Sequence, residues 1–154
     1  MFARTQRLML RPGWTEDAPE LTHAIAHQQL VRNLGRAPWS YALGDAKAFL
    51  AAQSAVAERN GASFLICTLD HGVSRIVGGV GFGPYDGEPH EFGYWITPDA
   101  WGRGYATEAG RAVIDIARAL RVPRLSAGHY ADNPASGRVL RKLGFQPTGR
   151  VVPR

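Results

Sequence analysis

Hydrophobic and polar residues alternate in several short runs of the chain, which is typical of strands with one buried face. In residues 4–11, Leu8 and Leu10 point one way while Arg7, Met9 and Arg11 point the other. Gly and Asp residues between later runs indicate turns and predict consecutive antiparallel hairpins. The predicted strands are residues 4–11, 63–69, 76–82, 90–97, 125–130 and 145–152.

Four other stretches have apolar residues at helical spacing. Asp17 and Asp45 are suited to cap the first two helices, and Asn60-Gly61 to end the second. The clearest helix covers residues 105–120, and a short one covers residues 135–143. The apolar stripe of the helix 105–120 consists of Ala106, Ala109, Val113, Ile116, Ala117 and Leu120. The order of elements predicts one mixed α/β domain over residues 1–154, with helices packed on a largely antiparallel sheet.

Composition narrows the class of protein. The 154 residues are 45% hydrophobic and 20% charged, as in an ordinary globular domain. We expect no membrane span and no secretory signal, since no long apolar run is present. The single cysteine, Cys67, suits a reducing cytoplasm. The net charge of +5 is carried mostly by scattered arginines and suits nucleic acid and a phosphate-rich small ligand equally, so the charge alone does not decide between them. A nucleic-acid partner is not expected.

The chemistry is concentrated where the strand 90–97 leads through a glycine-rich loop into the helix 105–120. Gly102 and Gly104 permit close backbone approach, and a helix start offers unpaired N–H groups and a positive dipole end to a diphosphate. A plain turn is the simpler interpretation. A dinucleotide fingerprint fails because Thr107 occupies the third glycine position, and a P-loop fails because no Gly-Lys-Ser/Thr is present.

The loop resembles the pyrophosphate motif of the GNAT acetyltransferase superfamily, Gln/Arg-x-x-Gly-x-Gly/Ala. The matching residues are Trp101, Gly102, Arg103, Gly104, Tyr105 and Ala106. Trp101 departs from the usual Gln/Arg, and both this departure and the continuation to Ala109 look like the ribosomal-protein alanine acetyltransferase (RimJ/RimL-like) branch. About 30 residues later, Asn133 and Ser136 match the family's Asn-x-x-Ser, although they also suit a plain helix start.

The resemblance implies a GNAT fold and acetyl-CoA as co-substrate, with no metal. Such domains normally end with one strand more than this sequence predicts, so the last strand is expected to be missing or supplied by a partner, for instance in a homodimer. The implied pantetheine contacts are Ile96, Thr97 and Asn133. The implied diphosphate contacts are Trp101, Gly102, Arg103, Gly104, Tyr105, Ala106 and Thr107.

The resemblance also implies roles for residues outside the loop. Glu91 would be the general base that deprotonates the amine, although it could be an ordinary strand-end acid. Ser136 would protonate the departing thiolate. His23 and His27 have metal-ligand spacing but lack a third ligand, so no metal is expected. The acceptor pocket would be framed by the first two helices and lined by Trp14, His27, Trp39 and Tyr41, for which core packing is an equal explanation.

The implied function is transfer of an acetyl group from acetyl-CoA to a primary amine, by direct attack in a ternary complex. The acceptor would be a protein N-terminal α-amine or a small amine or amino acid. At pH 7 an α-amine is roughly 10% neutral and lysine about 0.04%, so a modest base suffices for the former. The alternative is a CoA-binding regulatory module without turnover.

Overall fold

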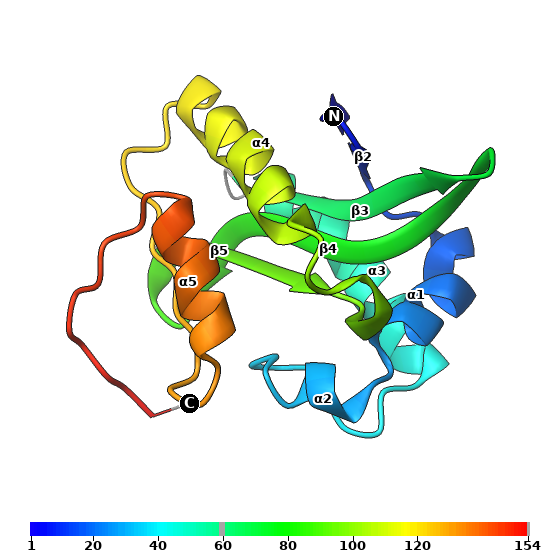
Figure 1. Cartoon of the computed structure of the whole chain (residues 1–154), viewed down its shortest axis with the longest axis horizontal. Helices are drawn as coiled ribbons and strands as arrows, with labels where there is room; N and C mark the ends of the chain where they lie inside the picture. The colour runs from blue at the N-terminus through cyan, green and yellow to red at the C-terminus, as the bar shows by residue number, and fades with distance from the viewer. Residues whose placement is uncertain (59–60, 154) are drawn as a thin grey trace.

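The computed structural model describes residues 1–58 and 61–153 and shows a five-stranded antiparallel sheet with helices on both faces (Figure 1). The strands lie in the order β1–β2–β3–β4–β5, so each pairs with its neighbour along the chain. This confirms the predicted mixed α/β class. The strands are β1 Ala3–Arg4, β2 Leu8–Arg11, β3 Ala62–Asp70, β4 Val73–Tyr85 and β5 Glu88–Ile96.

The helices agree with the sequence pattern where amphipathicity is strong. The longest are α3 Leu43–Glu58 and α4 Tyr105–Ala119, and the others are α1 Ala18–Ile25, α2 Gln28–Val31, α5 Pro134–Lys142 and the 3-10 helices η1 Thr15–Asp17 and η2 Pro98–Ala100. Asp45 does not cap α3, because it lies inside the first turn and accepts the N–H of Ala42 at 2.8 Å. Asn60 lies outside the described residues, while Gly61 donates to the carbonyl of Val56 at 2.9 Å.

Each face of the sheet has its own hydrophobic core. Leu8 and Leu10 are 3% and 0% exposed and pack with α4 and α5, whereas Met9 between them is 38% exposed. Leu65 and Trp95 face the other way and pack with α1, α2 and α3. The alternation expected of a sheet buried on two sides thus separates an α4–α5 face from an α1–α3 face.

Two predicted strands are wrong, and a third, residues 4–11, is divided by a turn into the paired strands β1 and β2. In residues 125–130 only Ser126 pairs, through a parallel bridge to Glu91, and residues 145–152 form no strand. An apolar run becomes a strand only where a neighbour satisfies its N–H and C=O groups, and among the described residues only Ser126 of these two segments pairs with a strand. Phe145 still packs against Phe92, with ring centroids 5.5 Å apart, but Val151 is 90% exposed. The sheet therefore ends at β5.

No helix among residues 1–58 and 61–153 is long and apolar enough to cross a bilayer.

The start of α4 is held against the turn between β1 and β2. The Glu108 carboxylate accepts hydrogen bonds from the Thr5 hydroxyl, the Arg7 N–H at 2.9 Å and the Arg7 Nε at 2.7 Å. Burial raises the pKa of Glu108, but the hydrogen bonds from Thr5 and Arg7 outweigh it, so the pKa is lowered overall. The Arg7 guanidinium also lies 4.8 Å from the centre of the Tyr105 ring. These contacts fix the helix end that follows the glycine loop.

Glu108→Gln is expected to reduce the free energy of unfolding by about 1–2 kcal/mol at pH 7, because hydrogen bonds to a charged group are lost. The melting temperature should fall by roughly 3–6 °C, measured by thermal denaturation. Since the folded pKa is lowered, this stabilisation is present above the ordinary value of 4.5 and disappears as the pH falls through the folded value. Asp115→Asn, which removes an exposed ion pair of the same helix, should change little; equal losses in both variants would contradict the assignment.

Candidate functional site

The glycine loop depends on two backbone conformations that other residues rarely adopt. Gly102 and Gly104 have φ values of +76° and +77°, and Gly104 is the N-cap of α4. A Cβ on Gly102 would meet nothing within 4 Å, and one on Gly104 only Arg7 Nη2 at 3.5 Å. Packing therefore does not require glycine here, whereas backbone conformation does. The loop and Arg103 are exposed, and the first N–H groups of a helix have no partner within it, so this helix start could receive an anion.

Trp101 and Thr97 fasten this loop to the rest of the fold. Trp101 Nε1 donates to the carbonyl of Ile96 at 2.7 Å, so the indole holds the loop to the end of β5. The Thr97 N–H donates to Val77 O at 2.8 Å and its hydroxyl to Ala24 O at 2.7 Å. Thr97 thus faces β4 and α1, while Ile96 O faces the outer edge of the sheet.

The outer edge of β5 is paired only near its beginning. Phe92 donates to Ser126 O at 2.7 Å, and Ser126 donates to His90 O at 3.0 Å. Within the described chain this bridge does not extend into a ladder. Backbone groups of alternate residues point to the same edge, so those of Tyr94 and Ile96 face the side that Ser126 leaves. This stretch offers donors and acceptors to an extended ligand that contains amides.

On the α4–α5 face, Tyr94 meets the predicted residue Ser136. The Tyr94 hydroxyl donates to Ser136 Oγ at 3.1 Å. Burial raises the pKa of Tyr94 despite the opposing effect of this hydrogen bond, so the phenol remains protonated at neutral pH. Asn133, the half-buried N-cap of α5, lies just before Ser136. The sequence analysis missed Tyr94, although strand alternation from Phe92 could have placed it on this face.

Glu91 lies on the opposite face of the same strand. It is half-buried, and alternation places it with Gly93 and Trp95 on the α1–α3 face. Its partner on β4 is Gly83, where a Cβ would meet Val56 of α3 at 3.3 Å. The two candidates for proton transfer thus lie on opposite faces of β5: Glu91 projects from the strand toward α1–α3, whereas Ser136 approaches it from the α4–α5 side.

Glycines surround Glu91 on its face of the sheet. Gly81 pairs with Gly93, and Gly93 is exposed with nothing within 4 Å of an added Cβ. Farther along, a Cβ on Gly79 would lie 2.4 Å from Trp95 Nε1, so the indole requires glycine there. The tryptophan explains the glycine at one end of this strand. At the other end Gly83 and Gly93, the neighbours of Glu91 on β4 and β5, contribute no side chain.

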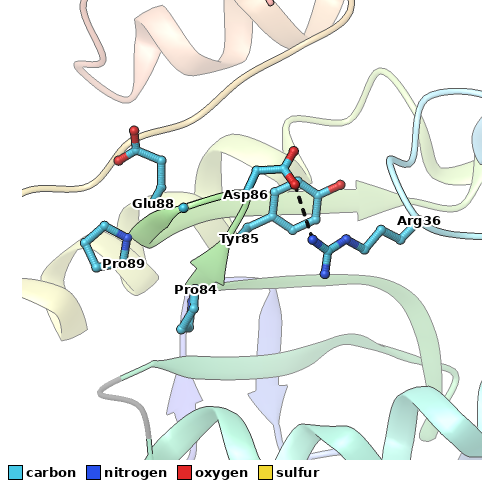
Figure 2. A pocket seen from close by; sticks show the side chains of 7 residues that line it. Arg36, Pro84, Tyr85, Asp86, Glu88 and Pro89 are labelled. Atoms are coloured by element: carbon cyan, nitrogen blue, oxygen red, sulfur yellow. Dashed lines mark hydrogen bonds and ion pairs between the residues drawn. The ribbon is translucent and has the colours of Figure 1, made fainter. Parts of the chain in front are cut away.

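The loop after α2 contacts two segments near β5. Arg32 pairs with Asp132, just before α5, at 2.5 Å. Arg36 pairs with Asp86 at 3.3 Å and lies 4.2 Å from the centre of the Tyr85 ring (Figure 2). The pocket drawn there has a volume of about 440 Å³ and is lined by Arg36, Pro84, Tyr85, Asp86, Gly87, Glu88 and Pro89. Both ion pairs are exposed and therefore contribute little free energy, whereas Leu34 and Ala37 of the same loop pack against the α1–α3 core.

The four residues predicted to line an acceptor pocket do not gather in one place. Trp14 stacks on Arg11 at 4.5 Å beside β2, which lies three strands from β5. Tyr41 is buried in the α1–α3 core, where burial and the nearby Asp45 raise its pKa to about 12. Trp39 is exposed in the loop between α2 and α3.

His27 lies in a second pocket, of about 510 Å³, between α1 and the β3–β4 hairpin, together with Thr97. Its Nε2 is 3.1 Å from the carbonyl of His23.

Among the described residues no three His, Cys, Asp or Glu side chains gather as a metal site. Burial raises the pKa of the Cys67 thiol, which makes it a poor nucleophile.

Comparison with known proteins identifies relatives along almost the whole chain. The acetyltransferase (GNAT) domain family matches residues 7–146. The chain is 30% identical over 152 residues to YoaA, an uncharacterized N-acetyltransferase of Bacillus subtilis, spanning 94% of this chain and 82% of that protein.

Solved acetyltransferases share the fold. RimL, a ribosomal L7/L12 α-N-protein acetyltransferase solved in complex with coenzyme A, has a TM-score of 0.80 at 18% identity, covering 94% of this chain and 84% of RimL. The microcin C7 self-immunity acetyltransferase MccE, solved with acetyl-CoA and AMP, has a TM-score of 0.75 at 18% identity, covering 91% and 79%. The family match and the shared fold together show that this chain belongs to the GNAT acetyltransferases and is an acyltransferase.

Proposed function

We propose that this GNAT acetyltransferase moves an acetyl group from acetyl-CoA to a primary amine, by direct attack within a ternary complex. The observation that carries the proposal is the outer edge of β5. The glycine loop follows one end of this strand, Ser136 approaches it on one face and Glu91 lies on the other. The complexes of RimL with coenzyme A and of MccE with acetyl-CoA support the choice of donor.

The donor is assigned to the loop and to the edge of β5. The N–H groups at the start of α4, from Gly102 to Thr107, would bind the diphosphate, with Arg103 adding charge. The pantetheine arm would run along the outer edge of β5 toward Ile96, where its amides can pair with backbone groups of Tyr94 and Ile96 that face this edge. Thr97 would support this end of the strand through its bonds to β4 and α1. Asn133 would hydrogen-bond this arm or the adjoining backbone.

The reaction needs two proton transfers, and the two faces of β5 supply them. Glu91 would take a proton from the amine, whose nitrogen attacks the thioester carbon and forms the C–N bond. The tetrahedral intermediate then collapses with cleavage of the C–S bond. Ser136 would give its proton to the departing thiolate while accepting one from the Tyr94 hydroxyl, which donates to it at 3.1 Å. After product release, Glu91 would lose its proton to solvent and Tyr94 would regain one from solvent. Tyr94 thereby joins the residues that the sequence indicated.

The acceptor would approach from the α1–α3 face, where Glu91 is flanked by glycines. The loop between α2 and α3, which carries Trp39, would form one boundary of its path, and His27 lies at the start of α2. An α-amine at a protein N-terminus, or a small amine or amino acid, is the preferred acceptor because a modest base suffices for it. RimL, which has the same fold, is named for action on a protein α-amine.

Gly104→Ala is expected to weaken acetyl-CoA binding at least tenfold, because its Cβ would stand where the diphosphate must approach the backbone. In the wild type, acetyl-CoA at about 100 times Kd should raise the melting temperature by roughly 5–10 °C. Gly72→Ala is the matched control, because its φ of +79° imposes the same strain in the distant β3–β4 turn. A full acetyl-CoA shift in Gly104→Ala would contradict the assigned phosphate site.

Glu91→Gln is expected to lower kcat by about 10²–10⁴-fold with α-amine acceptors, because the amide cannot accept the proton. Turnover is followed by release of the CoA thiol across a panel of amines and N-terminal peptides. Acetyl-CoA affinity should stay near the wild-type value, since Glu91 lies on the face opposite Ser136. Wild-type kcat in this variant would exclude Glu91 as the base.

Tyr94→Phe is expected to lower kcat about tenfold or more, with a larger loss in Ser136→Ala, because the phenol resupplies the proton that Ser136 gives up. The same thiol-release assay measures both. In a Ser136→Ala background, the change Tyr94→Phe should have little further effect. Independent, multiplying losses would instead assign the two hydroxyls separate roles.

A further inference from the structure

Ser126 carries a polar group that the fold leaves without a partner. Its hydroxyl oxygen is shielded from solvent and makes no hydrogen bond within the part of the chain that the structure describes. A buried hydroxyl costs free energy unless it is hydrogen-bonded, so each such group requires an explanation. The backbone of Ser126, in contrast, is fully engaged with β5 through His90 and Phe92.

The backbone pairing determines which side chain lies beside this hydroxyl. Ser126 and Glu91 are partners in a parallel bridge. Partners in a bridge project their side chains to the same face of a sheet, as neighbours about 5 Å apart at Cβ. Glu91 faces α1–α3, and the Ser126 side chain therefore lies next to it there. The pair also marks the point at which the two segments begin to diverge.

We propose that Ser126 is a positioning residue that donates a hydrogen bond to the Glu91 carboxylate in the ternary complex. With one carboxylate oxygen held by this hydroxyl, the other is turned toward the acceptor amine and takes its proton. Hydrogen bonds of this kind are often long or misaligned before substrate binds and tighten only in the complex. The inference rests on the proposed function, because it requires Glu91 to act as the base.

A purely structural serine at this position would behave differently. Ser63 shows the contrast: its hydroxyl accepts a hydrogen bond from Gln53 Nε2 at 3.0 Å, so its loss should lower stability. Replacing the unpartnered Ser126 by alanine removes a buried polar group and should leave the melting temperature unchanged or raise it. A serine whose removal maintains stability but reduces turnover is retained for the reaction.

The experiment compares Ser126→Ala, Ser126→Cys and Ser126→Thr with the control Ser63→Ala, measuring kcat, KM and melting temperature for each. Ser126→Ala and Ser126→Cys should lower kcat about 10- to 100-fold with KM for acetyl-CoA unchanged. Ser126→Thr, which restores a hydroxyl on a strand-compatible side chain, should recover most of the activity. Ser63→Ala should lower the melting temperature and leave kcat near the wild-type value.

A double-mutant cycle tests whether Ser126 acts through Glu91. In a Glu91→Gln background, Ser126→Ala should have almost no further effect on kcat. The inference would be overturned if Ser126→Ala kept the wild-type kcat, or if it lowered kcat as much in the Glu91→Gln background as in the wild type. It would also be overturned if Ser126→Ala lowered the melting temperature as Ser63→Ala does. Failure of the proposed function shows separately, because it would leave the wild-type protein itself without turnover.

Discussion

The hydrogen bonds between Ser126 and β5 end at Phe92, and the arrangement of the whole site depends on this early divergence. Only one residue of the 125–130 segment, Ser126, pairs with β5. If the pairing continued, the backbone groups of Tyr94 and Ile96 would be used inside the sheet. Because it stops, β5 is an ordered strand whose outer edge can bind an extended molecule. The GNAT relatives solved with coenzyme A or acetyl-CoA share this fold.

A strand with one open edge also separates the chemistry by face. Tyr94 and Ser136 meet on the α4–α5 side, where burial keeps the phenol protonated. Glu91 lies on the α1–α3 side, beside Ser126 and among glycines. In the mechanism proposed for this protein, the proton donor and the proton acceptor therefore never compete for the same space. Acetyl donor and amine would reach the edge from opposite sides, which suits direct transfer in a ternary complex.

In the mechanism proposed here, hydrogen bonds hold the elements assigned to the acetyl donor, whereas the loop assigned to the acceptor path makes exposed ion pairs as well as core contacts. Glu108 ties the start of α4 to the β1–β2 turn by three hydrogen bonds, and Trp101 ties the loop to β5. The loop after α2 makes the exposed ion pairs of Arg32 and Arg36, which contribute little free energy, and packs Leu34 and Ala37 against the α1–α3 core.

The sequence alone determined the elements that depend on residues close to one another in the chain. Alternation around Leu8 and Leu10, the apolar stripe of α4 and the loop from Trp101 to Ala106 are all short-range patterns. The structure places them where they were expected, except that Leu120 follows the end of α4 and is 48% exposed. The motif residues also indicated the family, which the match over residues 7–146 confirms. Their individual roles remain predictions that the variants can test.

Only the tertiary structure decided which residues become neighbours across the chain. The segments 125–130 and 145–152 have strand-like sequences but lack partners along most of their length, and a strand requires a partner to satisfy its backbone. Trp14 and Tyr41 have residue types that suit a pocket, yet sheet order places one beside β2 and packing buries the other. The pairs Tyr94–Ser136 and Ser126–Glu91 join residues more than 30 positions apart. No local pattern records such contacts, because they arise only when the sheet and the helices on its two faces have assembled.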